Sequence, residues 1–212
     1  SLTEGQQEQV KNLFYTVSDI ERAGDHAENI AELAETLSKN SGSFSKKGKA
    51  DLELISAQTM QSLQIAVESR ETGSVKSANA VRVLEQSVDQ LEGEMREKHI
   101  RRLSKGKCDP ESGVIFLDII SNLERISDHA VNLVESAEEI RNKGLSFSVH
   151  AKQELAVLTA AVGEVMDLAL DAFLQNDPAL AAKVEPLEQV VDTLKEQLRN
   201  RHILRLQKGE CT

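Results

Sequence analysis

The chain has 212 residues, of which 40% are apolar and 28% charged, while only 3% are aromatic and none is Trp. This apolar fraction is enough for a core, and the scarcity of aromatics together with only 3 Pro indicates an all-α fold with a core of Leu, Ile, Val and Ala. The net charge of −10 argues against a nucleic-acid partner and against docking on an anionic bilayer, because phosphate groups are bound by clustered Lys and Arg. Such a chain attracts cations.

Helical periodicity organises the chain from end to end. It predicts six helices, over residues 3–38, 50–71, 75–104, 111–142, 149–175 and 178–207. The first has an apolar seam with alternating steps of three and four, formed by Leu13, Val17, Ile20, Gly24, Ala27, Ala31, Ala34 and Leu37. Pro186 should bend or interrupt the first turns of the last helix. No apolar run approaches the ~20 residues that span a bilayer.

The sequence repeats itself with a constant shift of 103 positions. The repeated segments are 20–32 with 123–135, 84–89 with 187–192, and 99–108 with 202–211. This period predicts two tandem three-helix bundles related by an internal repeat, over residues 1–108 and 109–212. With up-down-up topology, the first and third helices of each bundle would run parallel and bring equivalent faces to matching heights.

The polar residues kept in both copies lie on one narrow face of the first and third helix of each repeat. At one end of the face we expect interhelical ion pairs, Glu32 with Arg96 and Glu35 with His99. At the other end we expect four carboxylates to meet in each copy. These quartets are Glu21, Asp25, Glu85 and Asp89 in the first copy, and Glu124, Asp128, Glu188 and Asp192 in the second.

Carboxylates packed in this way destabilise a fold unless they spread into water, hold protons or bind a cation. We therefore interpret the quartets as metal sites; a solvated acidic face and a contact for a partner's basic patch are the alternatives. Oxygen ligands suit Mg, Ca, Mn and ferric iron, or zinc held by carboxylates. His26 and His129 are either further ligands or supporting residues at the edge of the bundle. Asn29 and Asn132 supply either a carbonyl ligand or a helix-to-helix hydrogen bond.

Other motifs bear on compartment and catalysis. Cys108 and Cys211 follow equivalent turns and have neither zinc spacing nor a disulfide framework, so free thiols in a reducing compartment are expected. The chain has no Gly-rich phosphate loop and none of the Glu-x-x-His pairs of ferritin-like di-iron sites. We therefore expect no enzymatic activity; a metallophosphatase that uses the same carboxylates is the remaining enzyme hypothesis.

The motif Glu-Arg-x-x-Asp-His-Ala-x-Asn-[Ile/Leu]-x-Glu, which begins at Glu21 and again at Glu124, resembles the signature of the PhoU family of phosphate-uptake regulators. The resemblance covers nearly the whole chain. It implies tandem three-helix bundles whose acid-x-x-x-acid motifs bind metal clusters. Carried over by position, the eight carboxylates of the two quartets would be the ligands. Iron or zinc are the expected metals, with Mg, Mn or Ca as alternatives.

The order of the helices departs from the stand-alone regulators, in which two helices precede the first Glu-Arg-x-x-Asp helix. Here that helix comes first, an order that resembles the PhoU-like cytoplasmic tail of bacterial sodium/phosphate cotransporter-family proteins. We therefore expect a metal-binding regulatory domain of phosphate uptake, at the cytoplasmic side of the inner membrane, whose partner is a transporter membrane module in the same polypeptide. The alternative is a stand-alone cytosolic adaptor that negatively regulates phosphate transport and phosphate-sensing signalling. Either could form a homodimer.

Overall fold

The computed structural model describes residues 3–208, and within that range it contains helices and no strand, which confirms the all-α prediction. The helices are α1 (Glu4–Lys39), α2 (Lys46–Thr72), α3 (Val75–Leu103), α4 (Pro110–Asn142), α5 (Val149–Gln175), α6 (Pro178–Ala181) and α7 (Val184–Lys208). Cys108 is a free thiol, and Cys211 lies outside the described residues.

Local signals account for most helix boundaries. Helix α2 begins four residues before the predicted start, because the Ser45 hydroxyl caps it by accepting a hydrogen bond from the Gly48 N–H. It ends at Gly73, whose left-handed conformation (φ 68°) is the usual helix stop. The predicted interruption by Pro186 is present as the break between the four-residue α6 and α7. A proline at this place has no N–H to donate to the carbonyl of Ala182, so the helix cannot run through.

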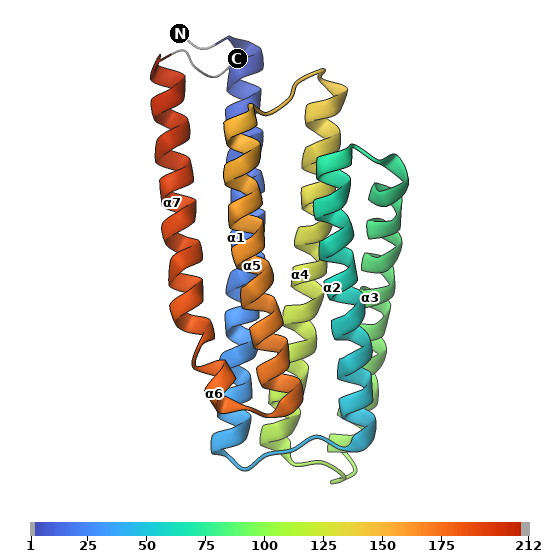
Figure 1. Ribbon diagram of the computed structural model, residues 1–212. Coiled ribbons are helices and arrows are strands. Elements are labelled where there is room, and N and C mark those ends of the chain that lie inside the picture. The colour runs from blue at the N-terminus through green and yellow to red at the C-terminus, as the bar shows by residue number, and fades with distance from the viewer. Residues whose placement is uncertain (1–2, 209–212) are drawn as a thin grey trace.

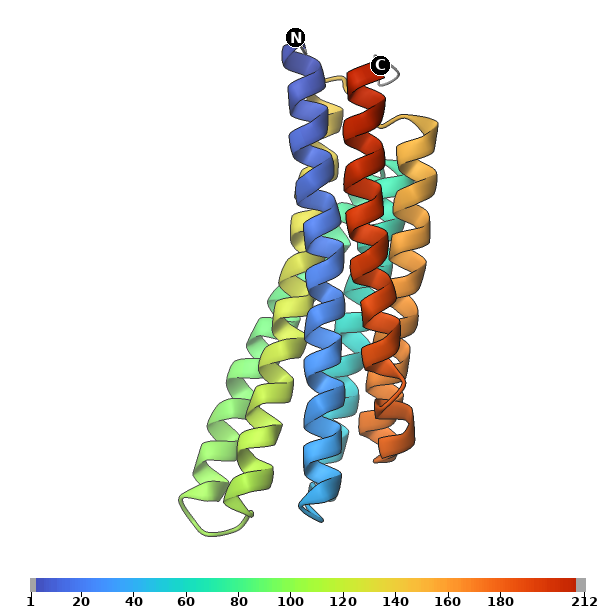
Figure 2. The same ribbon diagram turned by 90° about the vertical axis from the view of Figure 1, so that its left-hand side faces the viewer.

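The six long helices form two groups of three that lie side by side (Figure 1). One group contains α2, α3 and α4, and the other contains α1, α5 and α7. Helices α1 and α4 run antiparallel and pack directly against each other, so they join the two groups along their length (Figure 2). Among the described residues, α1 does not pack along α2 or α3, although the Arg70 side chain near the end of α2 reaches Thr16 of α1.

The prediction that the three helices of one repeat pack together was therefore wrong. The first helix of each repeat packs against the second and third helices of the other repeat: α1 against α5 and α7, and α4 against α2 and α3. The physical reason is that duplicated helices present similar apolar faces, so either copy can fill the same place in a bundle. The placing of the repeat boundary at residues 1–108 and 109–212 stays a prediction.

A continuous apolar core fills both bundles and the contact between them. The predicted seam of α1 is buried throughout, from Leu13 to Leu37. In α4 the largest fully buried side chain is Phe116, accompanied by Ile119, Ile120 and Leu123. Because α1 and α4 are each packed on two sides, their polar residues are confined to narrow faces, and this confinement places the acidic side chains.

Candidate functional site

The exchange of α1 and α4 between the repeats gives the predicted carboxylates new partners. On the antiparallel pair α1 and α7, Glu21 and Asp25 lie near Glu188 and Asp192; we call these four residues the α1/α7 cluster. On the antiparallel pair α3 and α4, Glu85 and Asp89 lie near Glu124 and Asp128; these four form the α3/α4 cluster. All eight predicted residues thus fall into two groups of four, and each group contains two residues from the first repeat and two from the second.

The two interhelical ion pairs predicted at the other end of this face are absent among the described residues, because α1 does not reach α3. Arg96 instead pairs with Glu92, one turn earlier in its own helix. Glu35 pairs with Lys39 at 3.0 Å, again within one helix. The ring of His99 is buried and stacks on Phe116 of α4, with 4.8 Å between the ring centroids. That prediction was wrong.

In the α1/α7 cluster, a lysine partly compensates the carboxylates. Glu21 is only 7% exposed and forms an ion pair with Lys195 of α7, whose amino group also lies 3.9 Å from Asp192. Glu188 is 6% exposed and its Oε1 atom has no hydrogen-bond partner. Burial, followed by the neighbouring carboxylates, raises the pKa of Glu188 to about 7. Burial and the charge of Glu21 raise the pKa of Asp25 as well.

The α3/α4 cluster has no such lysine. Under the shift of 103 positions, the counterpart of Lys195 is Glu92, so this cluster gains a fifth carboxylate where the other has a cation. Burial is the main cause that raises the pKa of both Glu85 and Glu124, and the negative charge of Asp128 is the next. The charge of Glu92 raises the pKa of Glu124 further. Arg96 pairs with Glu92. The two clusters therefore differ in their charged neighbours, an ion pair of Lys195 with Glu21 in one and of Arg96 with Glu92 in the other, although their eight predicted residues are equivalent.

His26 and His129 lie at the contact between α1 and α4, where their rings stack with 5.6 Å between centroids. The His26 Nδ1 atom is 2.9 Å from the Asn122 side-chain oxygen, and the His129 Nδ1 atom is 3.0 Å from Asp19 Oδ1. Asn122 and Asp19 are themselves equivalent under the 103-residue shift. The histidines therefore take part in a pseudo-symmetric polar contact that holds the two bundles together.

Asn29 and Asn132 join the same contact. The side-chain amide of Asn29 donates to the Asn122 oxygen at 3.4 Å, and that of Asn132 donates to Asp19 at 3.2 Å. Of the two roles proposed for these residues, the helix-to-helix hydrogen bond is the one present. Burial lowers the pKa of His26, and its Nδ1–H donates to the Asn122 oxygen, which can only accept.

The donor chemistry of the clusters suits a hard cation, because it consists of carboxylate oxygens and includes a buried Glu188 oxygen without a partner. The side chains as they stand do not converge: within residues 3–208, no three His, Cys, Asp or Glu side chains gather as ligands of one metal ion would. Asp89, Asp128 and Asp192 are exposed, so their carboxylates have room to rotate. A bound cation would require such rotations.

The sequence reasoning missed three residues of these clusters: Lys195, Glu92 and Glu28. Glu28 belongs with the α1/α7 cluster, since its pKa is raised by burial and then by other carboxylates that include Asp25 and Asp192. The signal for the first two was present in the repeat, because Lys195 and Glu92 are a charge reversal within an otherwise matched acidic face.

Fold and site together define a class of helical-bundle protein with duplicated acid-x-x-x-acid pairs. The model of the PhoU domain matches residues 52–137 and 155–212, more than half of the chain, so the chain belongs to the PhoU domain family. The first matched segment covers most of α2, α3 and α4, which are consecutive in the chain and form one bundle. The second covers most of α5 and all of α6 and α7, whose bundle is completed by α1.

Two relatives are similar to the chain. One is the phosphate-specific transport system accessory protein PhoU homolog 1 of Thermotoga maritima, 29% identical over 167 residues, which cover 77% of this chain and 71% of that protein. The other is an uncharacterized protein of Deinococcus radiodurans, 26% identical over 128 residues, which cover 60% of this chain and 46% of that protein. No solved structure matches the chain. None of the helices within residues 3–208 has the length and apolar character needed to cross a membrane.

Proposed function

We propose that this chain is a PhoU-type adaptor that regulates phosphate transport by binding other proteins, not by catalysis. The observation that carries the proposal is the match of the PhoU domain to both bundles. The Thermotoga relative, named as an accessory protein of a phosphate-specific transport system, supports it. On this proposal the chain acts in the cytoplasm, and its partners are components of phosphate transport and phosphate-sensing signalling.

The finer hypothesis of a transporter's cytoplasmic tail stays a prediction. The named relative is an accessory protein, which favours the stand-alone adaptor. The coding sequence upstream of Ser1 distinguishes the two: several apolar spans of about 20 residues there would establish the transporter tail.

The proposal extends to metal binding by the two acidic clusters, with iron or zinc as the first candidates and Mg, Mn or Ca as the others. A bound cation would supply the positive charge that the packed carboxylates lack, and would thereby hold α3 against α4 and α1 against α7. In the α3/α4 cluster, Arg96 pairs with Glu92. In the α1/α7 cluster, Lys195 already supplies one positive charge to Glu21.

The test compares phosphate uptake in cells that lack the gene and carry either the wild type or a variant in which Glu85, Asp89, Glu124 and Asp128 are changed to the corresponding amides. A matched control changes four exposed acids, Glu97, Glu164, Asp167 and Glu196, by the same chemistry and the same net charge. We expect wild type and control to restore regulated uptake and to carry metal in elemental analysis, and the cluster variant to lose both.

Two outcomes would contradict parts of this proposal separately. Uptake that does not respond to the wild-type chain would refute the role in phosphate transport. Regulated uptake by a cluster variant that carries no metal would refute the role of the metal, while leaving the adaptor in place.

A further inference from the structure

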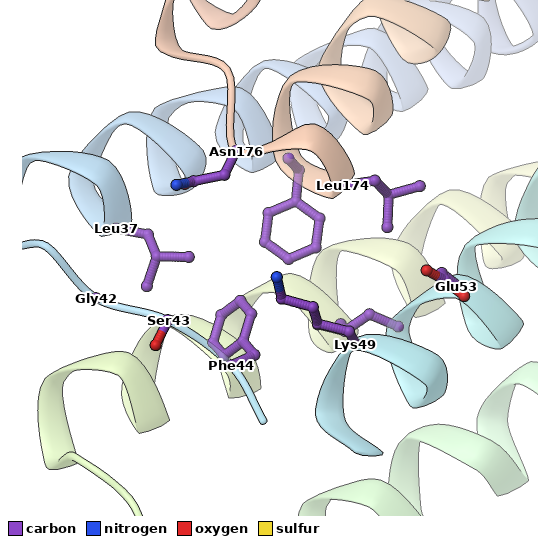
Figure 3. Close-up of a pocket in the computed structure, with 10 residues that line it drawn as sticks. Leu37, Gly42, Ser43, Phe44, Lys49, Glu53, Leu174 and Asn176 are labelled. Carbon is purple, nitrogen blue, oxygen red and sulfur yellow. The ribbon is translucent and has the colours of Figure 1, made fainter. Parts of the chain in front are cut away.

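The duplication produces two equivalent pockets at opposite ends of the molecule, and they differ in one decisive residue. The pocket between the end of α5 and the start of α2 is small, about 50 Å³. Phe44 lies against Phe173 there, with 5.7 Å between ring centroids; the Lys49 side chain extends toward Phe44, and Glu53 lies to one side (Figure 3). Two aromatic rings thus fill this pocket.

The equivalent pocket, between the end of α2 and the start of α5, is a cavity of about 740 Å³. Phe147 is the counterpart of Phe44 and Lys152 that of Lys49, but the counterpart of Phe173 is Arg70. The Arg70 guanidinium lies 4.9 Å from the centroid of the Phe147 ring and donates to the Thr16 hydroxyl at 2.8 Å. A cation therefore stands where the other copy has an aromatic ring.

Positive charge predominates in this cavity, although the chain as a whole carries −10. Arg70, Arg141 and Lys152 line it, against a single acid, Glu71. No carboxylate of the described residues forms an ion pair with Arg70, and burial lowers the pKa of Arg70 to about 10. Burying a guanidinium group without a carboxylate partner lowers the stability of the fold, and a bound anion would offset this loss.

The wall of this cavity contains both polar and apolar groups. Asn12 lines the cavity and is only 3% exposed, and its Oδ1 atom has no hydrogen-bond partner while its amide nitrogen donates to the Ser136 carbonyl. A buried acceptor of this kind is normally satisfied. The remaining wall is apolar and includes Ile140, Leu145 and Leu155.

We propose that this cavity binds a small organic anion with an apolar body, of the phosphate-monoester class. Its anionic group would lie against Arg70 and Lys152, and its body against Phe147 and Leu155. This site is separate from the acidic clusters and needs no metal, so it goes beyond the proposed function and stands or falls independently of it.

The test is calorimetric titration of the purified chain with phenyl phosphate, in the presence of a chelator so that no metal contributes. Arg70→Met keeps the length of the side chain and removes its charge, and Arg70→Phe copies the closed pocket. Lys152→Glu, at an exposed position in the first turn of α5, is a second variant that leaves the buried wall intact. Arg101→Met, on exposed α3 surface, is the matched control.

We expect binding to the wild type and the control, and a loss of about ten- to hundredfold in each cavity variant, the effect of removing a hydrogen bond to a charged group. Inorganic phosphate alone should bind more weakly than phenyl phosphate, because it cannot use the apolar wall. The proposal is overturned if phenyl phosphate does not bind the wild type at millimolar concentration. It is also overturned if Lys152→Glu and the correctly folded Arg70 variants bind as the wild type does.

Discussion

Glu188 provides the sharpest measure of how much the packed carboxylates destabilise the fold. In the folded chain its pKa is about 7, against 4.5 for an ordinary glutamate. As the pH rises from 4.5 to 7, the unfolded chain loses this proton first, so the free energy of unfolding falls across that window and is lowest above pH 7. The difference in pKa corresponds to about 3 kcal/mol, an upper limit for a residue that is 6% exposed.

The perturbation is Glu188→Gln, which keeps the shape of the side chain and removes its charge. In the metal-free protein with a chelator present, we expect the variant to be more stable than the wild type by about 1–3 kcal/mol at pH 8 and to match it near pH 4. Urea unfolding followed by circular dichroism at a series of pH values measures the difference. Glu196→Gln, at an exposed position of the same helix, is the control.

The reasoning is refuted if the stability difference between Glu188→Gln and the wild type is the same at pH 4 and pH 8. A constant difference would mean that the change acts through packing and that the Glu188 carboxylate is not under strain from its neighbours. A difference that grows with pH but appears equally in Glu196→Gln would assign the effect to net charge instead of to the cluster.

Two further predictions concern the polar contacts of α1. Lys195→Met removes the cation that pairs with buried Glu21 and should destabilise the metal-free protein by about 1–3 kcal/mol at pH 8. The control, Lys183→Met at an exposed position, should leave the stability unchanged. Equal urea midpoints for the two variants would contradict the role of the ion pair. Asn122→Ala removes the acceptor shared by His26 and Asn29 and should cost about 1–2 kcal/mol in thermal unfolding, whereas Asn122→Asp, which copies Asp19 of the other repeat, should retain most of the stability.

Sequence reasoning predicted the helices well because helix boundaries depend on neighbouring residues. The seam of α1 and the break before Pro186 follow from rules that operate within a few turns. The early start of α2 was missed, although the Ser45 cap belongs to the same kind of local signal. Elements that are fixed by their own side chains can be predicted from one sequence.

The pairing of helices could not be predicted in this way. The acid-x-x-x-acid faces of α3 and α7 are matched by the repeat, so Glu21 and Asp25 could in principle meet Glu85 and Asp89 or Glu188 and Asp192. Periodicity gives the same result for both arrangements, and only the packing of the whole chain distinguishes them. One signal was available: the helix order typical of the family places the Glu-Arg-x-x-Asp helix after its two companions, which would have paired α4 with α2 and α3.

Within a duplicated chain, residues kept in both copies and residues that differ carry different information. The kept carboxylates identify a property that both halves share, and they are equivalent in number and position. The differences distinguish equivalent places: Lys195 pairs with Glu21 in one acidic cluster where the other has Glu92, and Arg70 stands in a larger cavity at the place that Phe173 takes in the smaller pocket. Because each difference is a change of charge at a buried or half-buried place, each should alter what its half can bind. A cation is therefore expected to bind at the acidic clusters, and an anion beside Arg70.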